Sequence, residues 1–207
     1  MGADGPDGGR SDARIRLIRI GLELLTERGF GATGIDEILR RAEAPKGSFY
    51  HHFRSKSEFA LVLIGEYNNY FRGRITKSLL VNGKSAYARI SSMIDDLCAS
   101  MARYGYRRGC LIGNFTQELG SQHEAIRQRL EAVFREWETL LADCLAEGKS
   151  EGSIDGSLDP LDSASFFWIG WEGAIMRSKV AQNAVPLRRF GDTYLASIRG
   201  SFDGKLA

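Results

Sequence analysis

The sequence predicts an all-α protein of about nine helices, and three observations support this fold class. Apolar residues recur at three- and four-residue steps, as they do on one face of a helix, most clearly between Ile126 and Leu141. No window shows the sustained alternation of apolar and polar residues that is typical of a strand. Gly and Pro residues separate the periodic segments, where they end or begin helices.

The N-terminal segment predicts a leader and then a first helix. Residues 1–10 are rich in Gly and Asp, which predicts disorder. A helix is expected from Asp12 onward, and Gly29 is expected to end it. Its predicted buried face consists of four apolar residues, Ile15, Ile18, Leu22 and Leu25.

Two short helices should follow, joined by a tight turn. Thr33 is expected to cap the first of them, because a hydroxyl can accept a free backbone N–H of the first helical turn. Ala44-Pro45 should end that helix, and Pro45 suits the first position of the next one, over residues 45–52. Two short helices with such a turn are typical of a helix-turn-helix.

The rest of the chain predicts six further helices that form a C-terminal bundle. They are expected over residues 56–80, 85–104, 114–119, 121–147, 160–180 and 186–201. We therefore expect a leader (1–10), a three-helix head that carries the helix-turn-helix (11–56) and a helical bundle (57–207).

Composition excludes several classes of protein. The 207 residues carry a formal charge of only +2, so a nucleic-acid site must depend on where the basic groups lie. The three cysteines have no metal-like spacing, which predicts neither a metal site nor a cofactor. The longest apolar run, from Phe59 to Gly65, is too short to span a bilayer, and residues 1–14 do not resemble a signal peptide. We therefore expect a cytoplasmic protein without a membrane partner.

The predicted third helix carries residues suited to DNA. Lys46 supplies a cation at the groove entrance, and Gly47 lets the backbone approach the duplex. Tyr50 and His51 stand at positions that can reach phosphates or base edges. Lys56 opens the following helix, where its ammonium and the backbone N–H groups could share one phosphate.

This segment resembles the DNA-binding head of the TetR family of one-component regulators. The matching residues are Thr33, Ile38, Leu39, Ala42, Pro45, Lys46, Gly47, Ser48, Phe49, Tyr50, His51, His52, Phe53 and Lys56. The resemblance implies a homodimer whose two heads enter successive major grooves of double-stranded operator DNA. It also implies that Thr33, Tyr50, His51 and Lys56 hold phosphates, whereas Lys46, Gly47 and Ser48 lie nearest the bases.

The body is similar to the acrylate-responsive AcuR-type branch of the family and, more distantly, to its electrophile-sensing NemR type. The segments that carry this similarity are 107–120 and 167–179. The resemblance implies that residues 57–207 form a domain for dimerisation and for binding a small-molecule effector, with Cys110 and Lys179 at the sensing positions. A thiolate is the natural nucleophile toward an unsaturated acid, and a nearby cation would favour the thiolate and hold a carboxylate. The candidate cations are Arg107, Arg108, Arg177 and Lys179, the candidate apolar walls Tyr67, Trp168 and Trp171, and the candidate polar contacts Asn114 and Glu118.

The sequence leaves several alternatives open. Cys110 could be an unreactive residue that only packs in the core, or a redox switch that releases DNA when it is oxidised. Lys179 could cap a helix end, and the small residues Gly170, Gly173 and Ala174 suit a dimer contact through the last two helices. A cysteine-dependent enzyme is a remote alternative, because no nucleophile elbow or acidic partner accompanies Cys110, and we expect no enzyme.

Overall fold

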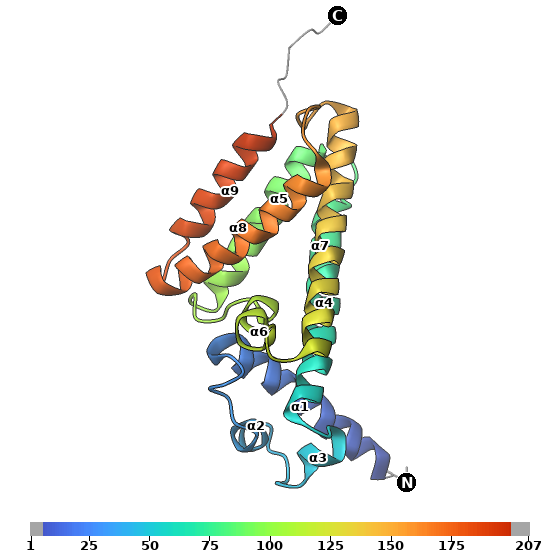
Figure 1. The fold of residues 1–207 in the computed structure, drawn as a ribbon, viewed down its shortest axis with the longest axis vertical. Helices are drawn as coiled ribbons and strands as arrows, with labels where there is room; N and C mark the ends of the chain where they lie inside the picture. Colours follow the sequence, from blue (N-terminus) through green and yellow to red (C-terminus); the bar gives the residue numbers. More distant parts are fainter. Residues whose placement is uncertain (1–5, 200–207) are drawn as a thin grey trace, which may run out of the picture. The chain divides into compact units, whose positions relative to one another are not determined.

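The computed structural model describes residues 6–199, and it describes side chains from residue 12 onward. Within this range the chain forms nine helices and no strand, which confirms the predicted fold class (Figure 1). The helices are α1 (Pro6–Arg28), α2 (Ile35–Arg41), α3 (Ser48–His52), α4 (Lys56–Leu79), α5 (Ala86–Arg103), α6 (Leu111–Leu119), α7 (Glu124–Glu151), α8 (Pro160–Ala181) and α9 (Val185–Ile198). None of them combines the length and apolar character that a membrane span requires.

The helices divide into two compact units. The first comprises the chain up to Asn69 together with Cys110–Glu131, and the second comprises Tyr70–Gly109 and the chain from Ala132 onward. Helices α4 and α7 each contribute to both units. The predicted boundary between residues 56 and 57 divides the chain by function and not by packing, so it stays a prediction. The packing itself groups α6 with the three N-terminal helices.

Several predicted helix boundaries were wrong by a few residues. Helix α1 begins at Pro6, so residues 6–10 of the predicted leader are helical, while residues 1–5 lie outside the described residues. Helix α3 begins at Ser48, because Pro45 instead starts a turn whose carbonyl accepts the Ser48 N–H at 2.8 Å. Helix α6 begins at Leu111, directly after the extended backbone of Cys110.

The predicted buried face of α1 was also partly wrong. Ile18 and Leu25 are buried as expected, but Ile15 is 58% exposed. Leu17 and Leu24 are fully buried instead. Apolar residues at seven positions between 15 and 25 allow more than one helical stripe, and the packing of α1 on its neighbours selects among them.

An aromatic cluster forms the core of the N-terminal helices. Phe49 and Phe53 of α3 and Phe59 of α4 are buried, and their ring centroids lie 4.7–5.4 Å apart. Gly21 of α1 faces this cluster at such close range that a Cβ atom there would lie 2.5 Å from the Phe59 ring. Because rings fill this space, α3 is fixed by its apolar side and presents its other side outward.

The second unit has its own aromatic core. Trp137 of α7 packs against Phe71 of α4 and Trp168 of α8, with centroid distances of 4.5 and 5.2 Å. Helices α8 and α9 run antiparallel side by side (Figure 1). Gly170 lets them approach, since a Cβ atom there would lie 2.1 Å from the Phe190 ring. Gly170 therefore serves contact within the chain, which corrects its predicted place at the subunit interface.

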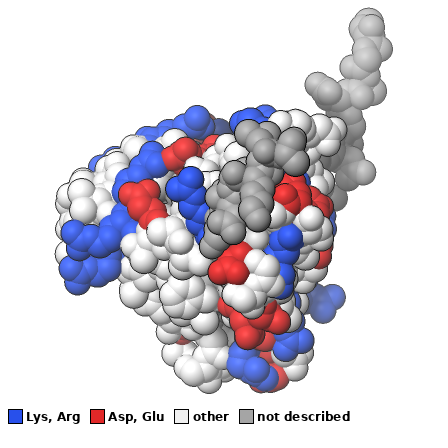
Figure 2. All heavy atoms as spheres, turned by 90° about the horizontal axis from the view of Figure 1, so that it is seen from above, with Lys and Arg blue, Asp and Glu red and all other residues white. Residues whose placement is uncertain are grey.

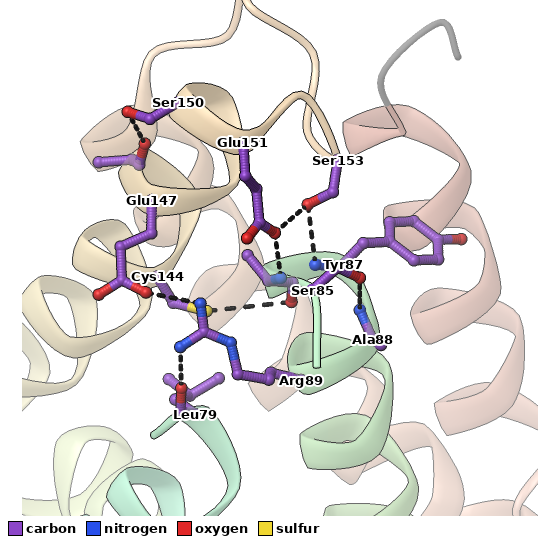
Figure 3. Close-up of polar contacts among 12 residues, drawn as sticks. Leu79, Ser85, Tyr87, Ala88, Arg89, Cys144, Glu147, Ser150, Glu151 and Ser153 are labelled. Carbon is purple, nitrogen blue, oxygen red and sulfur yellow. Dashed lines mark hydrogen bonds and ion pairs between the residues drawn. The ribbon is translucent and has the colours of Figure 1, made fainter. Parts of the chain in front are cut away.

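A polar cluster joins the ends of three helices in the second unit (Figure 3). The buried Arg89 of α5 donates to the carbonyl oxygen of Leu79 at 2.6 Å and to the Glu147 carboxylate of α7 at 2.5 Å. Glu151 accepts the Ala86 backbone N–H at 2.5 Å and the Ser153 hydroxyl at 2.6 Å. These bonds satisfy the last turn of α4 and the first turn of α5, where backbone groups lack helical partners.

Candidate nucleic-acid interface

The exposed side of α3 and the turn before it form the candidate interface. The turn is closed by the Ala44 N–H, which donates to the Leu39 carbonyl at 3.0 Å, and by Glu43 in the left-handed region with φ 50°. This is the backbone pattern of a capped helix end, and it allows α3 to follow α2 at once. Two short helices with a tight turn and a common buried side are the geometry of a helix-turn-helix.

The predicted tip of this helix is open to solvent. Lys46 and Gly47 are exposed, and a Cβ atom at Gly47 would meet no atom within 4 Å. Ser48 is half-buried; its hydroxyl oxygen is buried and has no hydrogen-bond partner among the described residues, so it would have to turn outward to reach DNA. The tip therefore combines a cation with backbone that another molecule can approach closely, as binding in a DNA groove requires.

Tyr50 and His51 lie on the same outer side of α3. Tyr50 is 64% exposed although its ring edge touches the buried Phe49 at a centroid distance of 5.4 Å. Contact with Phe49 restrains the ring, so the hydroxyl is held in solvent on a rigid support. His51 is exposed, with its ring 5.4 Å from that of His52. A tyrosine hydroxyl and an imidazole are both suitable donors to phosphate oxygens.

Thr33 is engaged inside the first unit. It is fully buried, and its hydroxyl donates to the Gly29 carbonyl at 2.8 Å, so in this structure it is not available to a phosphate. The prediction that Thr33 caps α2 was wrong, because Gly34 occupies the N-cap position without a side-chain bond. The buried hydroxyl instead closes the loop between α1 and α2.

Lys56 is also engaged inside the first unit. Its ammonium donates to the Phe30 carbonyl at 2.5 Å and lies 4.1 Å from the centre of the Phe30 ring. Burial lowers the pKa of Lys56, and the nearby Glu118 carboxylate opposes this shift. A phosphate contact by this ammonium would have to compete with these bonds.

Two arginines that were not predicted lie beside the interface. The Arg14 guanidinium of α1 lies 5.6 Å from the centre of the Phe53 ring, at the end of α3. Arg54 directly follows Phe53 in the chain, and its side chain is exposed. Only the packing of α1 against α3 brings Arg14 there, whereas the position of Arg54 could have been noticed in the sequence.

The net charge of the protein is small, so its electrostatic attraction to DNA depends on single charged groups. Figure 2 shows positive and negative side chains interspersed with uncharged ones on one face of the molecule. The formal charge is only +2. With so small a net charge, attraction to DNA depends on where the cations near α3 lie.

The predicted effector residues are distributed over both units. Tyr67, Cys110, Asn114 and Glu118 belong to the first unit, and Trp171, Arg177 and Lys179 to the second, as do Arg107 and Arg108. Cys110 is buried and stands at the N-cap of α6, where its carbonyl accepts the Asn114 N–H at 3.0 Å. Trp171 is buried in the aromatic core, stacked on Phe167 at a centroid distance of 5.6 Å.

Asn114 and Glu118 serve a different purpose from the one predicted. The Asn114 amide donates to the carbonyls of Leu25 and Thr26 at 3.1 and 3.3 Å. The Glu118 carboxylate accepts the backbone N–H groups of Phe30 and Gly31 at 2.8 and 2.6 Å. Both side chains thus bind the end of α1 and the loop after it. Their predicted role in an effector pocket is not supported by these bonds.

No metal site accompanies these residues. Among the side chains that the structure describes, no three His, Cys, Asp or Glu residues group as ligands for an ion. The remaining thiols, Cys98 and Cys144, are buried, and desolvation raises the pKa of both, that of Cys144 to about 11.

The fold and the exposed face of α3 define a helix-turn-helix DNA-binding regulator. Comparison with known proteins then identifies the family. Residues 17–63 match the model of the bacterial regulatory proteins of the tetR family, and residues 86–194 match that of a tetracyclin repressor-like C-terminal domain. The chain belongs to the TetR family.

Its relatives are transcriptional regulators. The chain is 42% identical to the transcriptional regulator AcuR of Cereibacter sphaeroides, over 86% of this chain and 81% of that protein. It is 32% identical to the HTH-type transcriptional repressor DhaR of Mycobacterium sp., over 87% of this chain and 89% of that protein.

Solved structures agree with these matches. The crystal structure of a regulatory protein TetR from Rhodobacter sphaeroides is 41% identical with a TM-score of 0.87, covering 90% of this chain and 98% of that one. The reduced form of E. coli NemR is 28% identical with a TM-score of 0.80, covering 91% and 98%. The predicted resemblance to the TetR family is therefore confirmed.

Proposed function

We propose that this regulator binds a palindromic operator as a homodimer in the cytoplasm and leaves it when a small unsaturated, electrophilic effector such as acrylate is present. The observation that carries the DNA-binding part is the exposed tip of α3 beside its buried aromatic side. Lys46, Gly47 and Ser48 would lie nearest the bases, and Tyr50 and His51 would hold phosphates. Two heads related by two-fold symmetry would read half-sites about one helical turn apart, roughly 34–36 Å.

The effector part depends on Cys110 and its place at the start of α6. In the proposed reaction, the Cys110 sulfur bonds to the β-carbon of acrylate. The electron pair of the C=C bond moves to the α-carbon, which takes up the proton that the thiol releases. The addition needs no oxidant or further reactant, and Cys110 acts as a sensor rather than as the nucleophile of an enzyme. Because effector and operator would favour different states of one dimer, each should weaken binding of the other by the same factor.

Mass spectrometry of the intact protein tests the reaction with Cys110. We expect wild type to gain one acrylate equivalent per chain at neutral pH, and we expect Cys110→Ser to gain none. Cys144 provides an internal control, because a thiol with a pKa of about 11 is thiolate in only about one molecule in ten thousand at pH 7.

Operator affinity in the same samples separates the alternatives. If Cys110→Ser still releases DNA with acrylate, effector binding is not covalent. If it has lost only its response to oxidant, Cys110 is a redox switch instead. Unchanged operator affinity of wild type at saturating acrylate would exclude acrylate as the effector.

Helix α8 offers a surface for the proposed dimer. Ile169, Met176 and Val180 are 72%, 51% and 83% exposed, and with Gly173 they follow the steps of four, three and four residues that define one helical face. Gly173 has open space around it, unlike Gly170, which faces Phe190. An exposed apolar stripe is typical of a helix that packs against a second copy, and α9, which lies beside α8, would complete the contact.

We expect Ile169→Glu to weaken dimerisation at least about 100-fold, because two-fold symmetry places the buried charge in the interface twice. Analytical ultracentrifugation at micromolar concentration should then find monomers where wild type is dimeric. Leu80→Glu is the matched control, since Leu80 is an exposed leucine directly after α4. A dimeric Ile169→Glu protein would exclude this face of α8 as the interface.

A further inference from the structure

Helix α6 holds the loop between α1 and α2 (residues 29–34) through one continuous face. Asn114, Phe115 and Glu118 stand at positions i, i+1 and i+4 of α6, and all three contact the chain between Leu25 and Gly31. Asn114 and Phe115 stand four and three residues before Glu118, so each of them is its neighbour on the helix surface. The contact is therefore made by a whole face of α6.

The polar bonds on this face all go to backbone groups at the end of α1 and in the loop. The Glu118 carboxylate accepts the successive N–H groups of Phe30 and Gly31, and the Asn114 amide donates to carbonyls in the last turn of α1. The Phe30 ring meets the edge of Phe115 at a centroid distance of 5.8 Å and an angle of 85°. Helix α6 thus supplies acceptors for the two loop N–H groups, and it gives the Leu25 carbonyl, which already accepts the Gly29 N–H at 3.1 Å, a second donor.

The loop is shaped around Glu118. Gly29 has φ +85°, and a Cβ atom there would lie 2.2 Å from a Glu118 oxygen. Lys56 also binds this loop, because its ammonium donates to the Phe30 carbonyl. The loop leads into α2, the first helix of the helix-turn-helix, so its conformation sets how α2 and α3 leave α1.

We propose that Asn114 and Glu118 are positioning residues that clamp the helix-turn-helix in its operator-binding conformation, and that operator release requires this clamp to loosen. This proposal rests on the proposed function and adds that the effector acts on the helix-turn-helix through α6. Cys110 begins the same helix one turn before Asn114. An adduct at Cys110 would therefore disturb the first turn of α6, and the change would reach the loop through Asn114 and Glu118.

Three variants test the clamp against a duplex that the wild-type protein selects from a random-sequence pool. Glu118→Gln keeps the size of the side chain but replaces one acceptor oxygen with a donor, and Asn114→Ala removes both bonds to α1. We expect each to weaken operator binding in the absence of acrylate on the order of tenfold, as measured by fluorescence anisotropy. Gln117→Ala is the matched control, because Gln117 is the exposed neighbour of Glu118 on α6, and its affinity should equal that of wild type.

Hydrogen exchange of the Phe30 and Gly31 amides gives a second readout that requires no variant. In wild type these amides should exchange more slowly when the operator is bound, and circular dichroism of the variants shows whether they are folded. Equal operator affinity of Glu118→Gln and Gln117→Ala, or equal exchange with and without operator, would overturn the clamp. A wild-type protein that binds the duplex but ignores acrylate would overturn only the proposed effector, and the affinities without acrylate would still decide the clamp.

Discussion

A protein with Lys46→Ala and Tyr50→Phe should fold normally and bind its operator about 100-fold more weakly than wild type, or worse. Each change removes one contact per head, and a dimer has two heads, so four contacts are lost together. A contact to a base edge contributes about 1–3 kcal/mol, and a phosphate contact somewhat less. Folding should be unaffected because Lys46 and Tyr50 are exposed, while the Phe49, Phe53 and Phe59 core beneath them is unchanged.

The matched control for this experiment is Lys77→Ala with Tyr70→Phe. Lys77 is exposed on α4, and Tyr70 is 63% exposed, close to the value for Tyr50, but neither belongs to the helix-turn-helix. Anisotropy titrations at several salt concentrations should show an unchanged salt dependence for the control. For the first variant the slope of log affinity against log salt should fall by about two, one for each lost lysine contact of the dimer. Undiminished affinity of the Lys46 and Tyr50 variant would contradict the whole assignment of the interface.

Local sequence signals were sufficient to predict the fold class and the helix-turn-helix. Apolar periodicity and the punctuation by Gly and Pro are properties of neighbouring residues, so α4, α5 and α8 could be predicted closely. The signals were weaker where two features competed. Pro45 suits the first position of a helix and also the start of a turn. In the structure it starts a turn.

The roles of single polar residues were harder to predict. Glu118 and Asn114 were expected in an effector pocket, but their partners are backbone atoms 87–89 residues away in the chain. A backbone N–H or carbonyl gives no signal in a sequence, because every residue but proline has both. Thr33 and Lys56 show the same limit, since both bind backbone carbonyls of the loop after α1. The exposed positions of Lys46, Gly47 and Tyr50 were easier, because Phe49 and Phe53 define the buried side of α3.

Arg89→Met should lower the free energy of unfolding by about 2–3 kcal/mol, far more than the loss of a surface ion pair. Methionine fills a similar volume but cannot donate, so the Leu79 carbonyl at the end of α4 loses its partner in a buried place (Figure 3). The Glu147 carboxylate is 55% exposed and can turn to water. Loss of the ion pair with Glu147 therefore adds little. The loss of stability comes from the unsatisfied Leu79 carbonyl and from the loss of its charged donor.

Arg127→Met is the matched control, because it also breaks an arginine–glutamate ion pair in the same protein. Arg127 and Glu124 are 56% and 63% exposed, lie within one turn of α7 and satisfy no backbone group. Water replaces such a pair almost completely, so the free energy of unfolding should stay close to that of wild type. Urea unfolding at neutral pH measures both proteins. Equal losses in the two variants would show that burial and the Leu79 carbonyl do not matter, and that the cluster in Figure 3 is no more than a second surface ion pair.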